Sequence, residues 1–347
     1  MPDAPRTRSA GPAAGEAPAA GPDSAPLLET RGLSRHFKVG AGYSRSTLHA
    51  VDDVDLVIGR AEIVALVGES GSGKSTIARL LAQVYRPTSG EIRYQGRSLA
   101  GLRGRRAQLR YRGDVPMVFQ DPFSSLNPVY RVSHGILRGL RLHRPELSRA
   151  ERQAEAERVV AAVGLTPAGE VLGRYPYELS GGQRQRIGFA QALAYRPTLI
   201  LADEPVSMLD VSIRIGLLNV MARLRAAEGV SFLYITHDIA SARYVSDRLL
   251  VMYGGHIVES GPTEAVLAEP RHPYTRLLLS AVPDPRAPLD VGTAAAQAEP
   301  AAVIDPAPGC RFRARCPLAV DACDRVTPRL RELGPAHSAA CHVAEAD

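Results

Sequence analysis

The sequence predicts an α/β fold in which short buried strands alternate with helices. The apolar run Ile63–Val67 leads into a glycine-rich loop, and apolar residues after this loop recur at helical spacing. Two more apolar runs, at residues 198–202 and 231–236, end at charged or histidine residues, where open α/β folds place their chemistry. Residues 28–66 alternate apolar and polar positions in short stretches, which predicts an antiparallel sheet beside the α/β core.

Composition argues against a chain embedded in a membrane. The 347 residues are 45% hydrophobic and 22% charged, which is typical of a globular protein. No uninterrupted apolar run approaches the ~18–20 residues that cross a bilayer. Residues 1–26 are rich in Ala, Pro and Gly and lack the apolar stretch of a signal peptide, so we expect a disordered tail there.

The net charge of +6 raises the question of a nucleic-acid partner. The densest basic run, residues 103–112, contains five arginines and a single aromatic residue, Tyr111. No helix-turn-helix or zinc-finger spacing accompanies this run. We therefore expect a solvated face there, and no nucleic-acid partner.

The chain is predicted to divide into a large domain, a linker and a small C-terminal module. The large domain covers 27–282, with a helical part over about 121–190 in which Ser148 and Glu151 form a capping box. Residues 248–259 predict a hairpin, because its two central glycines suit a tight turn. Residues 283–308 shift to Pro, Ala and Asp and predict a linker, and residues 309–347 carry all four cysteines.

Residues 68–76, GESGSGKST, fit the phosphate-binding loop pattern G-x-x-x-x-G-K-[ST]. Glycines let consecutive backbone N–H groups curl around phosphate oxygens, and the following helix points its positive end at the same anion. The alternative is a glycine-rich turn, but the strand before the loop and the helix after it are the context that a nucleotide site requires. We expect Lys74 to reach the β- and γ-phosphates of a nucleotide and the Ser75 hydroxyl to ligate Mg²⁺. The candidate ATP-binding residues of the loop are Gly68, Ser70, Gly71, Gly73, Lys74, Ser75 and Thr76.

Two adjacent carboxylates, Asp203 and Glu204, follow the apolar run at 198–202. Asp203 is predicted to hold Mg²⁺ through water, and Glu204 to polarise the attacking water as a general base. An apolar run followed by Asp-Glu is usually structural on its own. Downstream of a phosphate loop, it indicates the second half of a nucleotide site.

Residues 179–183, LSGGQ, resemble the signature sequence of ABC-type ATPases. The resemblance covers about 28–282. It implies a P-loop NTPase fold, with a RecA-like core, an antiparallel β subdomain and a helical subdomain, followed here by a small C-terminal extension. It also implies that one chain cannot complete the reaction, because Ser180 and Gly182 close over ATP held by a partner ATPase subunit.

The other marks of this family occur in the expected order. Gln120 matches the Q-loop and is an expected Mg²⁺ ligand and catalytic residue, Ser207 to Asp210 match the D-loop, and His237 matches the switch histidine that contacts the γ-phosphate. Phe37 occupies the place of the aromatic residue that stacks on adenine, with Tyr43 as the weaker candidate.

Two segments indicate a narrower resemblance, to the oligopeptide/dipeptide importer branch. They are DPFSSLNP at 121–128 and HPYTRLL at 272–278. The resemblance implies a peripheral subunit on the cytoplasmic face of the cell membrane. Its partners would be a second ATPase in a homo- or heterodimer, two membrane permease subunits and, indirectly, an extracytoplasmic binding protein.

The four cysteines, Cys310, Cys316, Cys323 and Cys341, are spaced C-x5-C-x6-C-x17-C. A zinc ribbon normally presents two C-x2–4-C knuckles, which this spacing lacks. The extensions of the peptide-importer branch are similar to segments that bind a 4Fe–4S cluster, and Arg311, Arg313 and Arg315 would offset the charge of such a cluster. Four reduced structural thiols are the alternative.

Other functions share most of these motifs. Oligosaccharide and nickel importers belong to the same branch, so the cargo stays open. An exporter subunit is disfavoured by the two peptide-importer segments. A soluble ABC ATPase acting on nucleic acid or ribosomes usually carries two cassettes or a long coiled coil, and this chain shows one cassette and no sustained heptads.

Overall fold

A computed structural model describes residues 25–40, 46–121, 126–207, 209–281 and 303–344. The tail predicted over 1–26 therefore lies almost wholly outside the described residues, as do Tyr43, Met208 and most of the predicted linker. No helix within the described ranges is long and apolar enough to span a bilayer.

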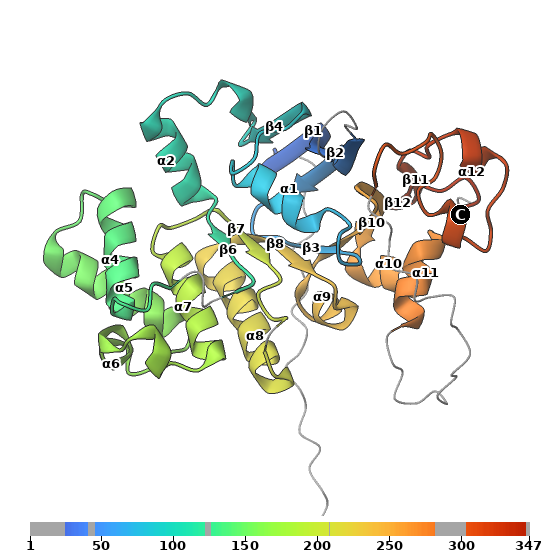
Figure 1. The fold of residues 1–347 in the computed structure, drawn as a ribbon. Coiled ribbons are helices and arrows are strands. Elements are labelled where there is room, and N and C mark those ends of the chain that lie inside the picture. Colours follow the sequence, from blue (N-terminus) through green and yellow to red (C-terminus); the bar gives the residue numbers. More distant parts are fainter. Residues whose placement is uncertain (1–24, 41–45, 122–125, 208, 282–302, 345–347) are drawn as a thin grey trace, which may run out of the picture.

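Two sheets face each other across one short helix (Figure 1). The described part of the smaller sheet is antiparallel and has the order β2-β1-β4-β5. Its strands are β1 (Leu28–Val39), β2 (Ser46–Ile58), β4 (Ser89–Tyr94) and β5 (Arg97–Ser98). The predicted antiparallel sheet is confirmed for 28–58, whereas Ile63–Val67 belongs to the other sheet.

The larger sheet has a parallel centre and an antiparallel edge, in the order β11-β12-β10-β9-β3-β8-β7-β6. Strand β3 pairs in parallel with β8 and β9, and β7 pairs in parallel with β8 and β6. The strands are β3 (Ile63–Val67), β6 (Met117–Val118), β7 (Leu199–Asp203), β8 (Ser231–Thr236), β9 (Arg248–Tyr253), β10 (His256–Pro262), β11 (Arg331–Gly334) and β12 (His337–Ala339). The predicted hairpin is β9–β10.

The core forms on both faces of the central strands because their side chains alternate between the faces. Val64 and Leu66 pack toward α1 (Lys74–Leu81) and the antiparallel sheet. Ile63, Ala65 and Val67 belong to the other cluster, which includes α7 (Gly181–Leu193) and α8 (Val211–Glu228). A strand buried on both faces explains why β3, β7 and β8 are continuously apolar in the sequence.

The helical part is formed by α4 (Val132–His143), α5 (Arg149–Ala162), α6 (Ala168–Gly173) and α7, which lie together at one end of the molecule (Figure 1). Ser148 and Glu151 make the predicted capping box at the start of α5. The remaining helices are α2 (Arg105–Asp114), α9 (Ile239–Val245), α10 (Thr263–Ala268), α11 (Pro273–Ser280) and α12 (Ala322–Arg325), with short 3-10 turns at Leu99–Gly101, Pro176–Glu178 and Arg313–Arg315.

The C-terminal extension does not form a sheet apart from the large domain. Strand β12 pairs with β10, so the extension continues the central sheet at its antiparallel edge. Residues 303–305, which the sequence assigned to the linker, pair with β2 instead.

Candidate nucleotide site

The phosphate loop connects β3 to α1, as predicted, and its shape depends on glycine. Gly73 has φ 108° and precedes α1 as its N-cap. A Cβ at Gly73 would lie 2.1 Å from the carbonyl oxygen of Ala50, so no other residue fits without a shift of backbone. Gly68 has φ 155° and the same constraint, since a Cβ there would lie 2.2 Å from the carbonyl oxygen of Met252. These close approaches hold the loop against β2 and β9.

Lys74 lies inside the loop rather than extending into solvent. Its ammonium group donates to the carbonyl oxygens of Gly68 at 2.7 Å and Glu69 at 2.8 Å. Burial lowers the pKa of Lys74, and the nearby carboxylates of Glu204, Asp203 and Glu69 act in the opposite direction. A buried ammonium group with only carbonyl partners is a strong donor for phosphate oxygens.

Ser75 and Asp203 meet although they are far apart in sequence. The Ser75 hydroxyl donates to Asp203 Oδ1 at 2.9 Å. Burial raises the pKa of Asp203, and the hydrogen bond from Ser75 lowers it. A hydroxyl and a carboxylate at this distance fit the oxygen donors that Mg²⁺ prefers.

Glu204 lies between Gln120 and His237. Gln120 Nε2 donates to Glu204 Oε2 at 3.2 Å, and His237 Nδ1 lies 3.4 Å from the same oxygen. Glu204 also has φ 46°, an uncommon backbone conformation for a residue with a side chain. The structure therefore brings together Lys74, Ser75, Gln120, Asp203, Glu204 and His237 at the ends of β3, β6, β7 and β8.

A cavity of about 520 Å³ adjoins these residues. Its polar end includes Lys74, Gln120 and Glu204, and Phe37 lies in its wall. The ring of Phe37 packs edge-on against Tyr85, with 5.5 Å between ring centroids, and the Arg35 guanidinium lies 4.5 Å from the centroid of Phe37. The lining residues are Phe37, Leu48, His49, Ala50, Ser70, Gly71, Gly73, Lys74, Ser75, Thr76, Arg79, Tyr85, Gln120, Glu204 and Val303.

Sequence reasoning missed several residues of this wall. Tyr85 and Arg79 belong to no motif that marks a nucleotide site. His49 and Val303 come from an antiparallel strand and from the predicted linker, and only the fold brings them to the cavity.

Ser180 and Gly182 lie at the start of α7 and are not part of this cavity wall. The Ser180 hydroxyl accepts a hydrogen bond from the backbone N–H of Gln183, which completes a capping box. A Cβ at Gly182 would lie 2.3 Å from a methyl carbon of Ile213, so glycine allows α7 to pack closely on α8. Ser180 is exposed, as a surface that receives a partner requires.

The four cysteines are free, and all lie in the extension. Burial, together with the charges of Cys323, Cys341 and Cys316, raises the pKa of Cys310 to about 11. The four cysteines do not form a ligand group: within the described residues, the one set of three potential metal ligands within 4.8 Å is His36, His49 and Asp52. The prediction that the flanking arginines offset a cluster is wrong, because Arg311 pairs with Asp52, Arg313 with Asp324 and Arg315 with Glu69.

A phosphate loop, a carboxylate pair at the end of β7 and a signature helix on this fold define an ATP-binding cassette. The chain belongs to the ABC transporter family: residues 51–207 match the family described as ABC transporter, and residues 258–323 match the oligopeptide/dipeptide transporter C-terminal region. It is an ATPase of this family.

Curated relatives match over most of their length. The chain is similar to a putative peptide import ATP-binding protein of Brucella ovis, with 42% identity over 316 residues that cover 91% of this chain and 97% of the relative. It is also similar to the oligopeptide transport ATP-binding protein OppF of Escherichia coli, with 41% identity over 91% of this chain and 95% of OppF. Among solved structures, the dimeric cassette MJ0796 has a TM-score of 0.61 and 27% identity, covering 68% of this chain and 99% of the other.

Proposed function

We propose that this ATPase powers the import of oligopeptides or dipeptides. The observation that carries the proposal is that Lys74, Ser75 and Glu204 line one cavity, with Asp203 bonded to Ser75. The curated relatives of the chain are named peptide import or oligopeptide transport proteins. The match of 258–323 to the oligopeptide/dipeptide transporter C-terminal region supports the same cargo class.

In the proposed reaction, the polar residues divide three tasks: holding the phosphates, holding Mg²⁺ and activating water. Lys74 would neutralise the β- and γ-phosphates, while Ser75 and Asp203 would hold Mg²⁺, with Gln120 as a further ligand. Glu204 accepts a proton from the attacking water, and His237 and Gln120 hold its carboxylate in place. Phe37 stacks on the adenine. Mg²⁺ supplies charge neutralisation at the phosphate oxygens.

Two ATPase subunits are needed in this proposal. Ser180 and Gly182 lie at the exposed start of α7 and would cover the phosphates bound by a second subunit, where the helix N-terminus favours an anion. The second subunit would be a copy of this chain or a related ATPase.

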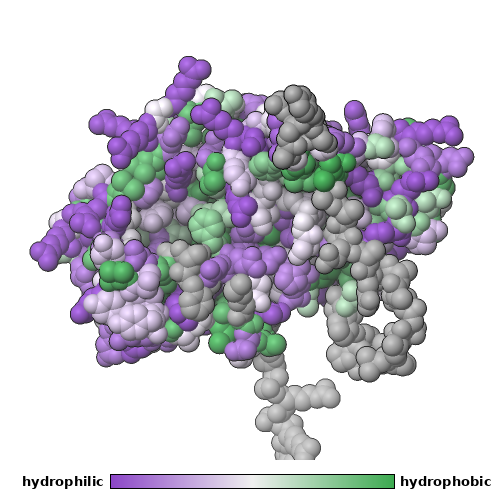
Figure 2. Space-filling model, in the orientation of Figure 1, coloured by the Kyte–Doolittle hydropathy of each residue, from purple (hydrophilic) through white to green (hydrophobic). Residues whose placement is uncertain are grey.

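The proposed membrane partners are two permease subunits, with this chain on the cytoplasmic face. Exposed hydrophobic side chains include Phe119, next to Gln120 in the sequence, and Val129, Tyr130 and Tyr177. A small groove of about 180 Å³ beside Tyr130 offers a place for a partner side chain. On the face shown in Figure 2, hydrophobic side chains form small patches among hydrophilic ones. Docking beside the Q-loop would couple ATP-driven closure to the permeases.

The 4Fe–4S cluster stays a prediction. In its favour, the four free cysteines share one small module, in which the backbone N–H of Cys310 donates to the carbonyl oxygen of Cys323 at 2.8 Å. Within the described residues no three of them lie within 4.8 Å of one another, and the four thiols are the residues that would hold a cluster.

The proposed function is tested with the chain co-expressed with the permease subunits encoded beside it. ATP hydrolysis by the assembled complex is measured with the extracytoplasmic binding protein, either empty or loaded with candidate peptides. We expect peptide to stimulate hydrolysis and Glu204→Gln to abolish it while ATP binding persists, because Gln cannot accept the proton.

Other outcomes separate the alternatives. Stimulation by an oligosaccharide or a nickel chelate in place of peptide would retain the importer and replace its cargo. Hydrolysis that responds to nucleic acid or ribosomes and not to the permeases would overturn the importer. Substantial hydrolysis in Glu204→Gln would remove Glu204 from the role of base.

A further inference from the structure

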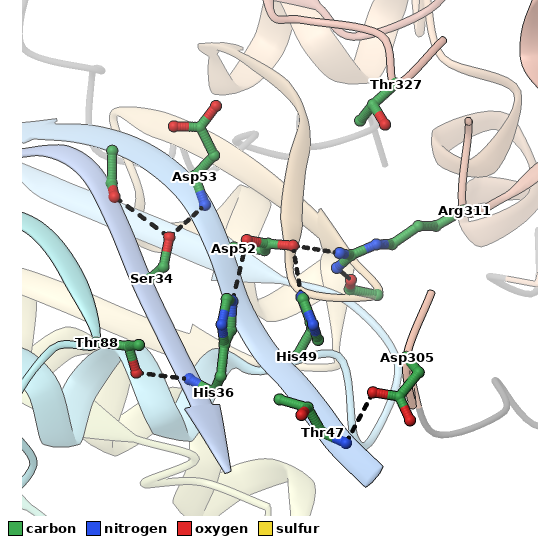
Figure 3. Close-up of polar contacts among 12 residues, drawn as sticks. Ser34, His36, Thr47, His49, Asp52, Asp53, Thr88, Asp305, Arg311 and Thr327 are labelled. Atoms are coloured by element: carbon green, nitrogen blue, oxygen red, sulfur yellow. Dashed lines mark hydrogen bonds and ion pairs between the residues drawn. The ribbon is translucent and has the colours of Figure 1, made fainter. Parts of the chain in front are cut away.

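The C-terminal extension reaches back to the wall of the nucleotide cavity. Val303 accepts a hydrogen bond from the backbone N–H of His49 at 2.9 Å, and its side chain lines the cavity. Two residues later, Asp305 donates its backbone N–H to Thr47 and accepts from the Thr47 N–H through its carboxylate, both at 2.9 Å. Residues 303–305, just before the cysteine-bearing part of the extension, therefore pair with the backbone of β2 (Figure 3).

An aromatic residue anchors the extension on the large domain. Phe312 is almost fully buried, and its ring centroid lies 5.2 Å from Tyr253, 5.4 Å from Tyr274 and 5.8 Å from His272. Tyr274 and His272 belong to the HPYTRLL segment, so the extension packs on this segment through Phe312. Burial of one large ring among three others fixes the chain on both sides of Phe312.

Arg311, just before the anchor, reaches the cavity-lining residue His49 through Asp52. Its guanidinium pairs with Asp52 Oδ2 at 2.5 Å and also donates to the Gly254 carbonyl oxygen. Asp52 in turn contacts His49 Nδ1 at 2.9 Å and His36 Nε2 at 3.1 Å (Figure 3). Partial burial alone would raise the pKa of Asp52, but the hydrogen bonds from His49 and His36 and the charge of Arg311 lower it to about 2.

This cluster is a hydrogen-bonded network rather than a metal site. His36, His49 and Asp52 could hold a cation by their spacing alone. The guanidinium of Arg311 already neutralises Asp52, and a cation bound there would be repelled by it. The imidazole rings of His36 and His49 are stacked, with 3.9 Å between their centroids, so fixing Asp52 also fixes the ring that lines the cavity.

Arg315, just after the anchor, contacts the phosphate loop itself. Its guanidinium makes two parallel hydrogen bonds to the Glu69 carboxylate, at 2.8 and 3.0 Å. The Glu69 carbonyl oxygen accepts from Lys74, and its backbone N–H donates to the hydroxyl of Tyr274. A bidentate Arg–carboxylate pair restricts both position and orientation, so Arg315 holds the backbone that orients Lys74.

We propose that the C-terminal extension is part of the ATP site, with Arg311 and Arg315 as positioning residues that set its affinity for nucleotide. Arg311 orients the His49 wall through Asp52, and Arg315 orients the phosphate loop through Glu69. By linkage, bound nucleotide stabilises the docked extension to the same extent as the docked extension favours nucleotide. The inference rests on the ATP site and is independent of the cargo.

Three variants of the full chain test it. Arg311→Ala and Arg315→Ala remove the pairs with Asp52 and Glu69, through which these arginines act on the cavity. Arg313→Ala is the matched control, because it removes the same charge from a position between them and pairs with Asp324 inside the extension. The Kd for a non-hydrolysable ATP analogue is measured for each. We expect Arg311→Ala and Arg315→Ala to raise the Kd by about threefold to thirtyfold and Arg313→Ala to leave it unchanged.

Further measurements separate positioning from a loss of folding. In the assembled transporter, Arg315→Ala should raise the KM for ATP more than it lowers kcat. Arg315→Lys, which keeps the charge and loses the bidentate geometry, should fall between wild type and Arg315→Ala. In a double-mutant cycle, Arg315→Ala should have little further effect once Glu69→Ala is present. Nucleotide should also slow hydrogen exchange in β11 and β12.

The proposal is overturned if Arg311→Ala and Arg315→Ala bind the analogue as tightly as Arg313→Ala. If either alanine variant fails to fold, the Kd of Arg311→Lys and Arg315→Lys is measured instead. Wild-type affinity for the analogue in both lysine variants would also overturn the proposal. If Arg311→Ala and Arg315→Ala raise the Kd for the ATP analogue while peptide still stimulates hydrolysis, the result would support this inference and leave the cargo assignment unchanged.

Discussion

The backbone conformation of Glu204 determines where its carboxylate lies in the candidate nucleotide site. The residue has φ 46°, and its backbone N–H donates to the Ile235 carbonyl oxygen at 3.0 Å, so β8 holds it in an unfavourable conformation. Such strain persists only where the surroundings impose it, and it concentrates at functional sites. The strained backbone places the carboxylate between Gln120 and His237 rather than along the line of β7.

Replacement of Lys74 tests the phosphate loop at this scale. Lys74→Ala removes a buried ammonium group whose two partners are carbonyl oxygens. Because hydrogen bonds to charged groups contribute about 1.5–3 kcal/mol, we expect ATP affinity to fall by about tenfold to a hundredfold. Equilibrium binding of ATP to the full chain measures the effect.

The second lysine provides a matched control. Lys38 is exposed on β1 and does not line the cavity, so Lys38→Ala should bind ATP as the wild type does. Circular dichroism checks that both variants are folded. Wild-type affinity in a folded Lys74→Ala would contradict the assignment of Lys74 to the phosphates.

The residues in and beside the cavity differ in how far the sequence predicts them. Lys74, Ser75, Asp203 and Glu204 were predictable, because a phosphate loop and a strand-end carboxylate pair have local patterns. The positive φ of Glu204 and the contact of Tyr85 with Phe37 have no local signal. The partners of Arg311 and Arg315 were mispredicted, since nearness in sequence to cysteines says nothing of contacts 246–259 residues away.

Helix α11 joins the large domain to the extension, and its start depends on one buried histidine. His272 is 1% exposed, and its Nδ1 accepts the backbone N–H of Tyr274 at 3.0 Å as the N-cap contact. Burial lowers the pKa of His272 from 6.5 to about 4. Only the neutral ring can accept this hydrogen bond at Nδ1, so acid weakens the start of α11.

The sign of the pH effect follows from this lowered pKa. Below pH 6.5 the unfolded chain binds a proton that the folded chain excludes until about pH 4, so stability is fully present above 6.5 and falls as the pH drops toward 4. One pKa unit corresponds to about 1.4 kcal/mol, which gives a loss of about 2 kcal/mol by pH 5 from His272. Urea unfolding of wild type and His272→Asn at pH 7 and pH 5 measures it.

Asn keeps a capping oxygen without a titrating ring, so His272→Asn should lose less stability than wild type between these pH values. Some loss should remain, because burial also lowers the pKa of His256 to about 4. An identical loss in both proteins would show that His272 does not titrate with unfolding.

Elements with strong local signals were predicted, and elements made by distant partners were not. The continuous apolar runs gave β3, β7 and β8, and Ser148 with Glu151 gave the start of α5. Strand β12 spans only His337–Ala339, too few residues for a period-two pattern, and it exists because β10 offers an open edge. The pairing of 303–305 with β2 has the same cause, since composition alone marks those residues as linker.

At the scale of the whole molecule, the proposed ATP site is divided. Lys74 and Glu204 line the cavity, whereas Ser180 and Gly182 lie at the start of α7, outside its lining. An ATP held at the phosphate loop therefore leaves the α7 N-terminus without its expected anion. Association of two chains that each offer one half to the other would complete both sites, and it would depend on ATP.

Sedimentation of the Glu204→Gln variant tests this association. The variant should bind ATP without hydrolysing it, so ATP with Mg²⁺ should convert monomer to dimer, and ADP should not.

Ser180→Arg added to Glu204→Gln should prevent the dimer, because a long side chain would fill the space for the partner's phosphates. The matched control is Ser89→Arg, at an exposed position of β4 outside the cavity, which should leave dimerisation intact. Loss of the Ser180 cap costs about 1 kcal/mol, too little to unfold the chain. A chain that needs a related ATPase as its partner would stay monomeric alone and dimerise only when that ATPase is added. If the variant that carries both Glu204→Gln and Ser180→Arg still formed dimers, the start of α7 would not be part of the contact between the two chains.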